Sequence, residues 1–406
     1  MPAIIEFPTV VQELLAEYGD LFANAPERRH FAEYLTGLKL AERKTVSGIN
    51  REFAVTTDQS CLNRWMTEVE WKPDALNKRR LDHLQRDWST RYTKHAVIAI
   101  DNTLIDHSGK LIADVGWFWD HADQRHLIAH DYLIANYVCA SDKHYPLEFR
   151  RFRKKDACLA DNTPFKNHTV LCKELIDWAV EQNIPGDFTF DSYFTNAEIL
   201  NHIASKNRNY VGDLKFNRTI TVAGQDWKVI EWVKAKLGPL CRQKTSANGK
   251  IQWYFTKSIR IPGITHIVRI VVLWKEQRDG EPRKILITNR TYWEVHRILK
   301  VYRKRWTGTE TFHRDGKQHL GMGACQLRNG EGQTRHMYLV FLAYSAMMGQ
   351  LQHDRAQEWA HVRLTTIGES CRAIFRETLG KTIAWVVEQV TQGQSLSQIK
   401  AHLALP

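Results

Sequence analysis

Two aspartates stand where runs of aliphatic residues end. Asp101 follows the run AVIAI, and Asp191 closes the short run DFTF. A carboxylate at the end of a buried strand is costly unless it is hydrogen bonded, paired or bound to a metal. Oxygen ligands without His or Cys favour a hard ion, Mg2+ or Mn2+, over zinc. The two acids therefore predict a divalent cation, and a turn or a helix N-cap is the alternative interpretation of Asp191.

A third acid lies in the segment VYRKRWTGTETFHRDGKQHLG, which has helical periodicity. Glu310 and Lys317 are seven residues apart, so they share one face of a helix. A carboxylate directed at a metal can then lie beside an ammonium directed at a phosphate. In isolation, the same spacing also fits a surface pair on an amphipathic helix.

The order of the predicted elements indicates how these acids are brought together. Residues 93–214 begin with three β-type runs, which predict a three-stranded antiparallel meander: VIAIDNTLID, KLIADVGWFWD and HDYLIANYVCAS. A helix over 164–182, a strand ending at Asp191, a helix over 196–206 and a strand over 209–214 are expected to follow. A meander followed by alternating helices and strands is the order of an RNase H-like α/β fold.

The remaining segments flank or interrupt this core. Residues 1–92 have helical spacing and are rich in Lys and Arg between positions 40 and 80. They predict an α-helical N-terminal domain that either presents a helix to DNA or exposes a solvated basic face. Residues 215–287 alternate as β strands do and predict a β-rich insertion. Helical periodicity resumes over 288–350, the second part of the catalytic core, and residues 351–406 predict a helical C-terminal region.

Composition narrows the class of partner. Lys and Arg number 57 against 45 Asp and Glu, and the net charge of +12 favours a polyanion, nucleic acid first. The seven cysteines include no CxxC pair, so neither a disulfide framework nor a zinc knuckle is expected. No apolar run is long enough to cross a bilayer, and the start lacks the features of a signal peptide. We expect a cytoplasmic protein without a membrane partner.

The segment around Glu310 resembles the signature of insertion-sequence DDE transposases, a cut-and-paste family with the pattern Y-x2-R-x3-E-x6-K. Tyr302 and Arg305 fit the first spacing, and Glu310 and Lys317 fit the last. Between Arg305 and Glu310 this chain has four residues, WTGT, instead of three. One interpretation is that a helix begins after Gly308. IDNTLIDHSGK, LITNR and KQHLGMGACQLRNGEGQTRHMYLVFLAYS resemble other family segments, so the likeness runs from about residue 95 to 350.

The resemblance implies a bacterial enzyme that cuts and joins DNA by in-line displacement at a phosphodiester. Asp101, Asp191 and Glu310 would be the catalytic acids and would hold two Mg2+ or Mn2+ ions, with Asp101 bridging both. Many relatives carry a second Asp where this chain has Asn102. The enzyme would associate with the nucleoid when bound to DNA.

The resemblance also implies DNA contacts and partners. Tyr302, Arg305 and Lys317 are expected to contact phosphates, which positions the strand without reading its sequence. The expected partners are double-stranded DNA, as terminal inverted repeats and as target, and a second copy of the chain in a homodimer on paired ends.

Two other functions share part of this evidence. An RNase H-like nuclease would use the same three acids and cut DNA without strand transfer. A DNA-binding protein derived from a transposase would keep the basic surface and lack catalysis, which the longer spacing between Arg305 and Glu310 allows. Metal-dependent cleavage of the element's own end separates the DNA-binding protein, which would not cut, from the transposase and the nuclease, which would.

Overall fold

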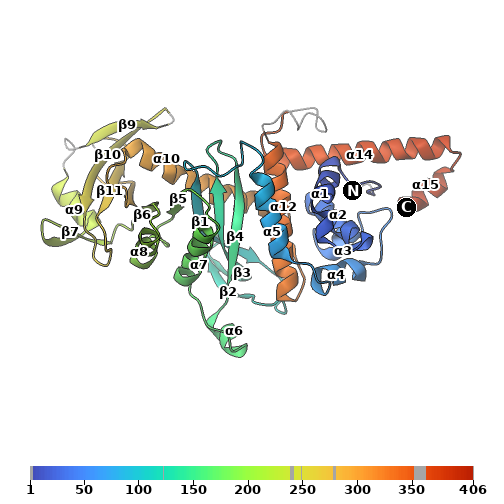
Figure 1. Cartoon of the computed structure of the whole chain (residues 1–406), viewed down its shortest axis with the longest axis horizontal. Coiled ribbons are helices and arrows are strands. Elements are labelled where there is room, and N and C mark those ends of the chain that lie inside the picture. The colour runs from blue at the N-terminus through green and yellow to red at the C-terminus, as the bar shows by residue number, and fades with distance from the viewer. Residues whose placement is uncertain are drawn as a thin grey trace. The chain divides into compact units, whose positions relative to one another are not determined.

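The computed structural model describes residues 3–121, 123–237, 242–247, 249–277, 280–351 and 363–405. The chain divides into two compact units, and each is described by itself. The unit that we call the central unit comprises Tyr92–Thr103 and Asp131–Thr311. The other, the terminal unit, comprises Met1–Arg91, Leu104–His130 and Phe312–Pro406. Figure 1 labels the elements of both units.

The central unit is built on a mixed β-sheet. Strands β1 (Val97–Asp106), β5 (Asp187–Phe190) and β6 (Tyr210–Asp213) pair in parallel. The same sheet continues through antiparallel strands β12 (Lys284–Thr288), β11 (Val268–Trp274), β10 (Lys250–Ile259) and β9 (Gln243–Ala247). On the other side of β1 lies β3 (Arg125–Val138), which pairs with β4 (His144–Phe152). The first four residues of β1, VIAI, and all four residues of β5, DFTF, are buried, as expected for parallel strands that are covered on both faces.

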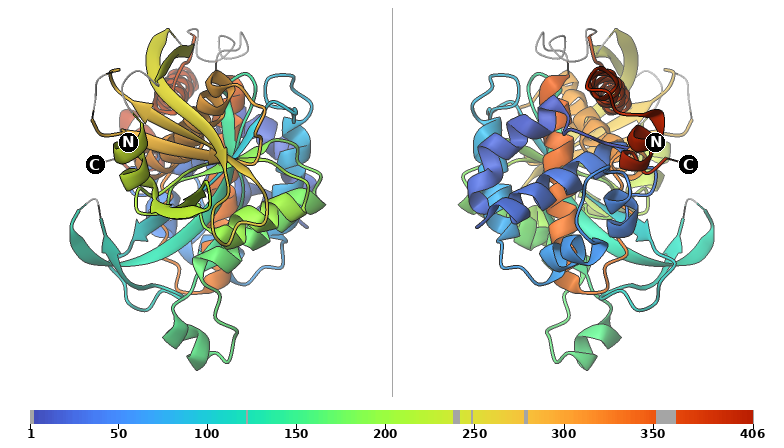
Figure 2. Two further views of the ribbon diagram at one scale, coloured as in Figure 1. Left: turned by 90° about the vertical axis from the view of Figure 1, so that its left-hand side faces the viewer. Right: turned by 90° about the vertical axis from the view of Figure 1, so that its right-hand side faces the viewer.

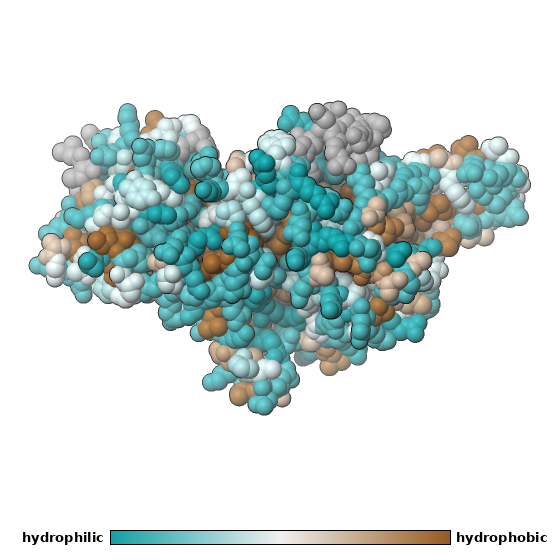
Figure 3. Space-filling view, in the orientation of Figure 1, coloured by the Kyte–Doolittle hydropathy of each residue, from teal (hydrophilic) through white to brown (hydrophobic). Residues whose placement is uncertain are grey.

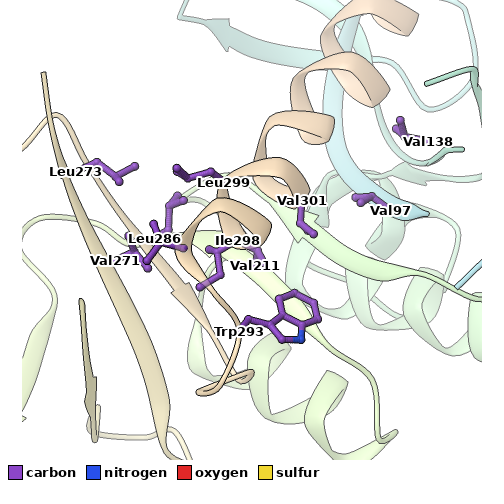
Figure 4. Packing of buried hydrophobic residues seen from close by; sticks show 11 residues of the cluster. Val97, Val138, Val211, Val271, Leu273, Leu286, Trp293, Ile298, Leu299 and Val301 are labelled. Atoms are coloured by element: carbon purple, nitrogen blue, oxygen red, sulfur yellow. The ribbon is translucent and has the colours of Figure 1, made fainter. Parts of the chain in front are cut away.

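Helix α10 (Val295–Trp306) packs against this sheet through an apolar cluster shown in Figure 4. Its apolar residues recur at helical spacing and include Ile298, Leu299 and Val301, while Arg and Lys occupy the rest of its last turns. Ile298 and Leu299 lie toward Val271 and Leu286 of the strands. Burying each such side chain contributes about 1.5–3 kcal/mol, so the cluster fixes the helix that leads to Glu310.

Further helices of the central unit lie beside the strands or beyond them. These are α6 (Lys155–Ala160), α7 (His168–Glu181), α8 (Ala197–Ser205) and α9 (Val229–Lys236). The hairpin of β7 (Thr219–Val222) and β8 (Gln225–Lys228) forms a separate two-stranded sheet. Helix α6 projects away from the sheet in Figures 1 and 2 and follows the basic end of β4.

The terminal unit is mostly helical. Its N-terminal part has α1 (Thr9–Tyr18), η1 (Gly19–Leu21), α2 (Ala25–Leu40), α3 (Val46–Asn50), α4 (Gln59–Thr67) and α5 (Pro73–Leu84). Its C-terminal part has α11 (Phe312–His319), α12 (Gly330–Gln350), α14 (Ile367–Thr391) and α15 (Leu396–His402), and β2 (Gly116–Asp120) pairs with the first residues of β3. Helix α12 is buried around most of its circumference, as expected for the central helix of a bundle. None of the described helices is both long and apolar enough to span a membrane.

Much of the predicted element order is confirmed. Helices before residue 90, helices α7 and α8, strand β6 and the return of helices after residue 291 are found where the patterns placed them. The strands predicted between residues 215 and 285 are also present, and β9 to β12 extend the main sheet. The predicted mixed α/β class is therefore correct.

Two local predictions are wrong. The first three β runs do not form a meander in chain order, because β3 lies between β1 and β2 and a fourth strand, β4, pairs with β3. The run HYPLEFRRF of β4 ends in charged residues, which hides its buried first half from a search for apolar alternation. Residues 229–236, predicted as strand, form α9, so tertiary context overrides the β propensity of its Val, Ile and Trp residues.

Candidate active site

Asp101 and Asp191 lie at the same level of neighbouring parallel strands. Ala99 of β1 is in register with Thr189 of β5, and each aspartate follows two residues later, Asp101 within β1 and Asp191 directly after the last residue of β5. Burial is complete up to Ile100 and becomes partial at Asp101, so the carboxylate lies where the strand emerges from the core. The predicted pairing of these two acids thus agrees with the register of the sheet.

Asp191 also shapes the loop that follows β5. Its Oδ1 accepts hydrogen bonds from the backbone N–H groups of Tyr193 (2.9 Å) and Phe194 (3.3 Å), an Asx-type turn. The hydroxyl of Thr195 donates to the backbone carbonyl of Asp191 at 2.6 Å. Helix α8 is capped by Asn196, not by Asp191. The turn interpretation of Asp191 is therefore correct for one carboxylate oxygen, and the structure gives Oδ2 no donor among the described residues.

Arg305 occupies the space beside Asp101. Its Nη1 donates to Oδ2 of Asp101 at 2.9 Å and lies 4.0 Å from Oε1 of Glu310. The Asp101 and Arg305 side chains are only 14% and 11% exposed, whereas that of Glu310 is 43% exposed. The Arg305 Nε is buried without a hydrogen-bond partner in the described chain. Sequence analysis predicted a phosphate contact for Arg305, and the structure places its guanidinium against an acid.

The extra residue between Arg305 and Glu310 is absorbed by a π-helical turn. Residues Thr307–Thr311 form this turn, η3, directly after α10, and α11 continues from Phe312. A π turn accommodates one additional residue without ending the helix, and such turns are frequent at functional sites. The interpretation that a helix begins after Gly308 is therefore wrong.

Gly308 lets the π turn approach the sheet. A Cβ atom at this position would lie 2.7 Å from Cγ2 of Val138 and 3.1 Å from Cβ of Ala99. Ala99 is two residues before Asp101 on β1. The contact therefore sets how closely Glu310 approaches the two aspartates.

Burial and the neighbouring acids raise the pKa of Asp101. Burial, the negative charge of Asp191 and that of Glu310 raise the pKa of the Asp101 carboxyl to about 7, against the opposing charge of Arg305. A divalent cation would relieve this repulsion, and three carboxylates are the oxygen donors that Mg2+ or Mn2+ prefers. Within the described residues, however, no three Asp, Glu, His or Cys side chains stand close enough together to hold a metal ion. The chemical type and charge of the acids thus fit a divalent ion. In this structure the cation beside Asp101 is the Arg305 guanidinium.

A second polar network flanks the aspartates and was not predicted. Asp131 of β3 is 3% exposed and accepts from Nδ2 of Asn102 (3.0 Å), and its other oxygen bonds Nε2 of His168 (2.8 Å). His168 stacks on Phe152 with ring centroids 4.2 Å apart, and its Nδ1 lies 3.3 Å from the Tyr193 hydroxyl. A signal existed in the sequence, because Asp131 is an acid inside the apolar run HDYLIANYV.

The other two predicted DNA contacts lie in different units. In the central unit, the Tyr302 hydroxyl bonds Nζ of Lys284 (2.9 Å) and Oδ2 of Asp213 (3.4 Å). Tyr302 is half-buried and its ring also lies under the Lys284 ammonium. Lys317 is exposed on α11 of the terminal unit.

A family match identifies the superfamily of this chain. The model of a family described as DDE superfamily endonuclease matches residues 17–231, which is 215 of the 406 residues. The chain belongs to the DDE superfamily of endonucleases. The predicted resemblance to DDE-type transposases and endonucleases is thereby confirmed. A comparison with curated proteins gives no match.

For a DDE endonuclease, a nuclease or transposase type of activity on DNA is expected. The match includes Asp101 and Asp191, and Glu310 lies beyond its end. Two of the three predicted acids therefore lie in the matched region. Glu310, the third, lies near Arg305 and contributes to the raised pKa of Asp101.

Proposed function

We propose that this DDE endonuclease is a transposase that binds the terminal inverted repeats of a mobile element, cleaves DNA there and transfers the strand to a target. The observation that carries the proposal is the shared level of Asp101 and Asp191 on parallel strands, with the charge of Glu310 acting on Asp101. In this proposal the protein has an RNase H-like core with a β-rich insertion over 215–287, and the core lies in the sequence between an α-helical domain over 1–92 and helices over 351–406.

In this proposal Asp101, Asp191 and Glu310 hold two Mg2+ or Mn2+ ions. When bound, such ions activate the nucleophile and stabilise the leaving oxygen of an in-line displacement. Asp101 supplies a buried carboxylate whose raised pKa reflects charge that a cation would neutralise. Asp191 keeps its turn through Oδ1, which leaves Oδ2 for a ligand. Glu310 comes from the π turn and is the most exposed of the three.

Arg305 has two roles in this proposal. It offsets part of the negative charge around Asp101 while the site holds no cation, and its Nε, which is buried without a partner among the described residues, gives the guanidinium an unused donor. A DNA phosphate can take the place of the carboxylate, since both accept the planar guanidinium in a similar geometry. Tyr302 and Lys317 are the further phosphate contacts, and Lys284 holds the Tyr302 ring in place.

The proposed homodimer has a candidate surface on α14. Five apolar side chains recur along this helix and are exposed: Phe375, Leu379, Ile383, Val387 and Val390. Their spacing of three or four residues places them in one stripe, part of which is seen in Figure 3. Exposed stripes of this kind mark interaction sites. Analytical ultracentrifugation of the wild type and of Ile383→Glu, with and without DNA ends, tests the dimer.

The function is tested by cleavage of DNA that carries the end of the element encoding the chain. Purified protein is incubated with labelled DNA and Mg2+, beside Glu310→Gln and the matched control Glu294→Gln. Glu294 is the N-cap residue of α10, the helix that leads to Glu310, and it pairs with His296. We expect metal-dependent cutting by the wild type and the control, and a rate at least a hundred-fold lower for Glu310→Gln, roughly the loss of one charge-stabilising group.

Two outcomes would change the proposal. Cutting that survives in Glu310→Gln would remove Glu310 from the catalytic set. Binding without any metal-dependent cutting by the wild type would support a transposase-derived DNA-binding protein. Cleavage without joining to a supplied target DNA would support a nuclease.

A further inference from the structure

A cavity of about 430 Å3 opens in the central unit behind the Asp191 turn. One part of its lining is the segment directly after Asp191, including Ser192 and Tyr193, and another is the link from β6 to β7 with the last residue of β8. Pro262, from the segment after β10, closes a third side. Its volume is in the range of ligand pockets that take one small molecule or one group of a larger one.

The charged residues that line the cavity are all basic. Lys215, Arg218 and Lys228 contribute three cations, and no Asp or Glu is among its described lining residues. Lys215 is exposed, and its ammonium has no hydrogen bond or ion pair among the described residues, although its backbone carbonyl accepts from the Arg218 N–H at 3.0 Å. Lys228 donates to the Thr219 hydroxyl at 3.0 Å, and Arg218 donates to the Pro262 carbonyl at 3.4 Å. Neither of these partners is charged, so the three cations are not neutralised within the cavity.

The nearest acid on the same link is committed elsewhere. Asp213, two residues before Lys215, pairs with Lys284 at 2.9 Å and lies 3.4 Å from the Tyr302 hydroxyl. It therefore balances a cation on the side of α10. The positive charge of the cavity is left for a ligand from outside the chain.

The remaining lining groups favour an anion that carries hydrogen-bond acceptors. Ser192, Asn217 and Thr219 supply hydroxyl and amide donors, and apolar lining is limited to a few side chains. The Tyr193 side chain is 53% exposed at the rim, where its ring can stack on a base. Cations with such donors and one exposed aromatic ring are the chemistry that recognises a phosphodiester strand.

The cavity and the acids share one turn of chain. Tyr193 and Phe194 donate their N–H groups to Asp191, and Tyr193 lines the cavity two residues after that acid. Two residues span at most about 7 Å of chain, which is the length of one or two nucleotide steps. A strand that crosses Asp191 would therefore place its next phosphate or the one after it at the cavity.

We propose that this cavity binds the DNA backbone phosphate that lies one or two nucleotides from the cleaved bond, with Lys215 and Arg218 as its principal contacts. The site rests on the proposed function for the position of the cleaved bond. Independently of that function, we infer that the Asp191 turn and the β6–β7 link form a phosphate-binding pocket. Bound there, the strand holds the scissile phosphate at the acids while the exposed Tyr193 ring covers the neighbouring base.

The test measures DNA affinity in EDTA, so that it does not depend on catalysis. Fluorescence anisotropy compares the wild type, Lys215→Ala, Arg218→Ala and the control Lys257→Ala on duplex DNA carrying the element's end. Lys257 is an exposed lysine of β10 in the same unit and does not line the cavity. We expect each pocket variant to bind roughly ten-fold more weakly, since hydrogen bonds to charged groups are lost. The salt dependence should fall by about 0.9 in log-log slope for each lost contact. The control should match the wild type.

A set of modified DNA ends locates the contact. Single phosphates of the cleaved strand are replaced in turn by uncharged methylphosphonates. At one position within two nucleotides of the cut, the replacement should weaken the wild type about ten-fold and leave Arg218→Ala unchanged, because the contact is already missing. Equal losses for wild type and variant at every position would overturn the proposal. Thermal melting of each variant checks that it is folded.

The two proposals fail in distinguishable ways. If the wild type cuts DNA with Mg2+ and both pocket variants bind and cut as it does, the pocket proposal is wrong and the transposase proposal stands. If neither the wild type nor the variants cut DNA, but the pocket variants bind DNA more weakly and one methylphosphonate position weakens only the wild type, the phosphate pocket stands and catalysis is absent.

Discussion

The Arg305 guanidinium lies 2.9 Å from Asp101 and 4.0 Å from Glu310, so one cation serves a group of acids. The single positive charge of Arg305 does not balance the negative charges of the three acids. Burial and the charges of Asp191 and Glu310 still raise the pKa of Asp101 to about 7. The ionised site therefore opposes folding at neutral pH, as is common where charges are gathered for function.

We expect Asp101→Asn to be more stable than the wild type near pH 8 without divalent ions, by on the order of a few kcal/mol. The folded-state pKa of this acid is raised, so the folded state keeps its proton longer than the unfolded chain. The stability of the wild type therefore falls as pH rises from the ordinary value of 3.8 to about 7. Urea denaturation of both proteins at about pH 5 and about pH 8 in EDTA measures the difference.

A divalent ion should stabilise the wild type near pH 8 more than it stabilises Asp101→Asn. Mg2+ bound to the folded state raises its unfolding midpoint, while Asp101→Asn has lost a ligand and should respond less. If the two proteins show the same pH dependence and the same response to Mg2+, the electrostatic account of Asp101 is wrong.

We expect Gly308→Ala to impair the site more than the fold. The added Cβ would meet Val138 at 2.7 Å and Ala99 at 3.1 Å, so the π turn must move away from β1. Overpacking of this kind costs about 1–3 kcal/mol of stability. A displacement of the Glu310 carboxylate by about 1 Å should lower the cleavage rate about a hundred-fold. Single-turnover cleavage and urea denaturation give the two quantities.

Gly380 provides the matched control for Gly308. It lies inside α14, and a Cβ atom there would have no neighbour within 4 Å. Gly380→Ala should gain about 0.5–1 kcal/mol from helix propensity and cleave DNA at the wild-type rate. Equal cleavage by Gly308→Ala and Gly380→Ala would show that the close approach of η3 to β1 does not position Glu310.

The level of the first two acids was predictable from sequence, whereas the placement of the third was not. Asp101 and Asp191 each end an apolar run, and buried parallel strands read as such runs. The π turn at Thr307–Thr311 leaves no pattern of its own, because its residues are mostly small and polar and Gly308 contacts strands that are distant in the sequence. Only the number of residues between Arg305 and Glu310 indicated that the helix is irregular there.

The network around Asp131 and the cavity at Lys215 show why other parts of the site escaped prediction. Asp131 bonds Asn102 and His168, residues 29 and 37 positions away. The cavity joins residues near 192, 215 and 262. Such sets depend on strand order, and the predicted meander had placed β3 wrongly. Local periodicity identified the elements but not which of their polar residues meet.

We expect Asp131→Asn to slow cleavage about ten-fold or more without weakening DNA binding. Asp131 fixes Asn102, next to Asp101, and His168, which contacts Tyr193 beyond Asp191. Groups that orient catalytic side chains typically contribute ten-fold to a hundred-fold. The apparent affinity for Mg2+ should fall with the rate, which a purely structural loss elsewhere would not produce. The readout is the rate of cleavage against Mg2+ concentration.

Asp177→Asn is the control for Asp131→Asn. Asp177 bonds His202 at 2.9 Å, close to the 2.8 Å between Asp131 and His168, and joins α7 to α8 in the same unit. Its variant should keep the wild-type rate and Mg2+ dependence. If both variants lose rate equally, the Asp131 network has no special role beside the aspartates.

We expect the terminal unit to lose stability in mild acid through His336. Burial lowers the pKa of this histidine to about 4, against the opposing effect of the Gly321 carbonyl, which lies 3.0 Å from Nε2 and raises the pKa. The unfolded chain then binds more protons than the folded chain between about pH 4 and 6.5, so stability is lost as pH falls through that range. The full loss is about 3 kcal/mol at 1.4 kcal/mol per pKa unit.

Urea denaturation at several pH values, monitored by a signal from the terminal unit, should show this slope for the wild type and for His402→Gln, whose histidine is exposed. His336→Gln should be less stable at neutral pH and should lack that part of the slope, and an unchanged slope would assign the acid sensitivity to other groups.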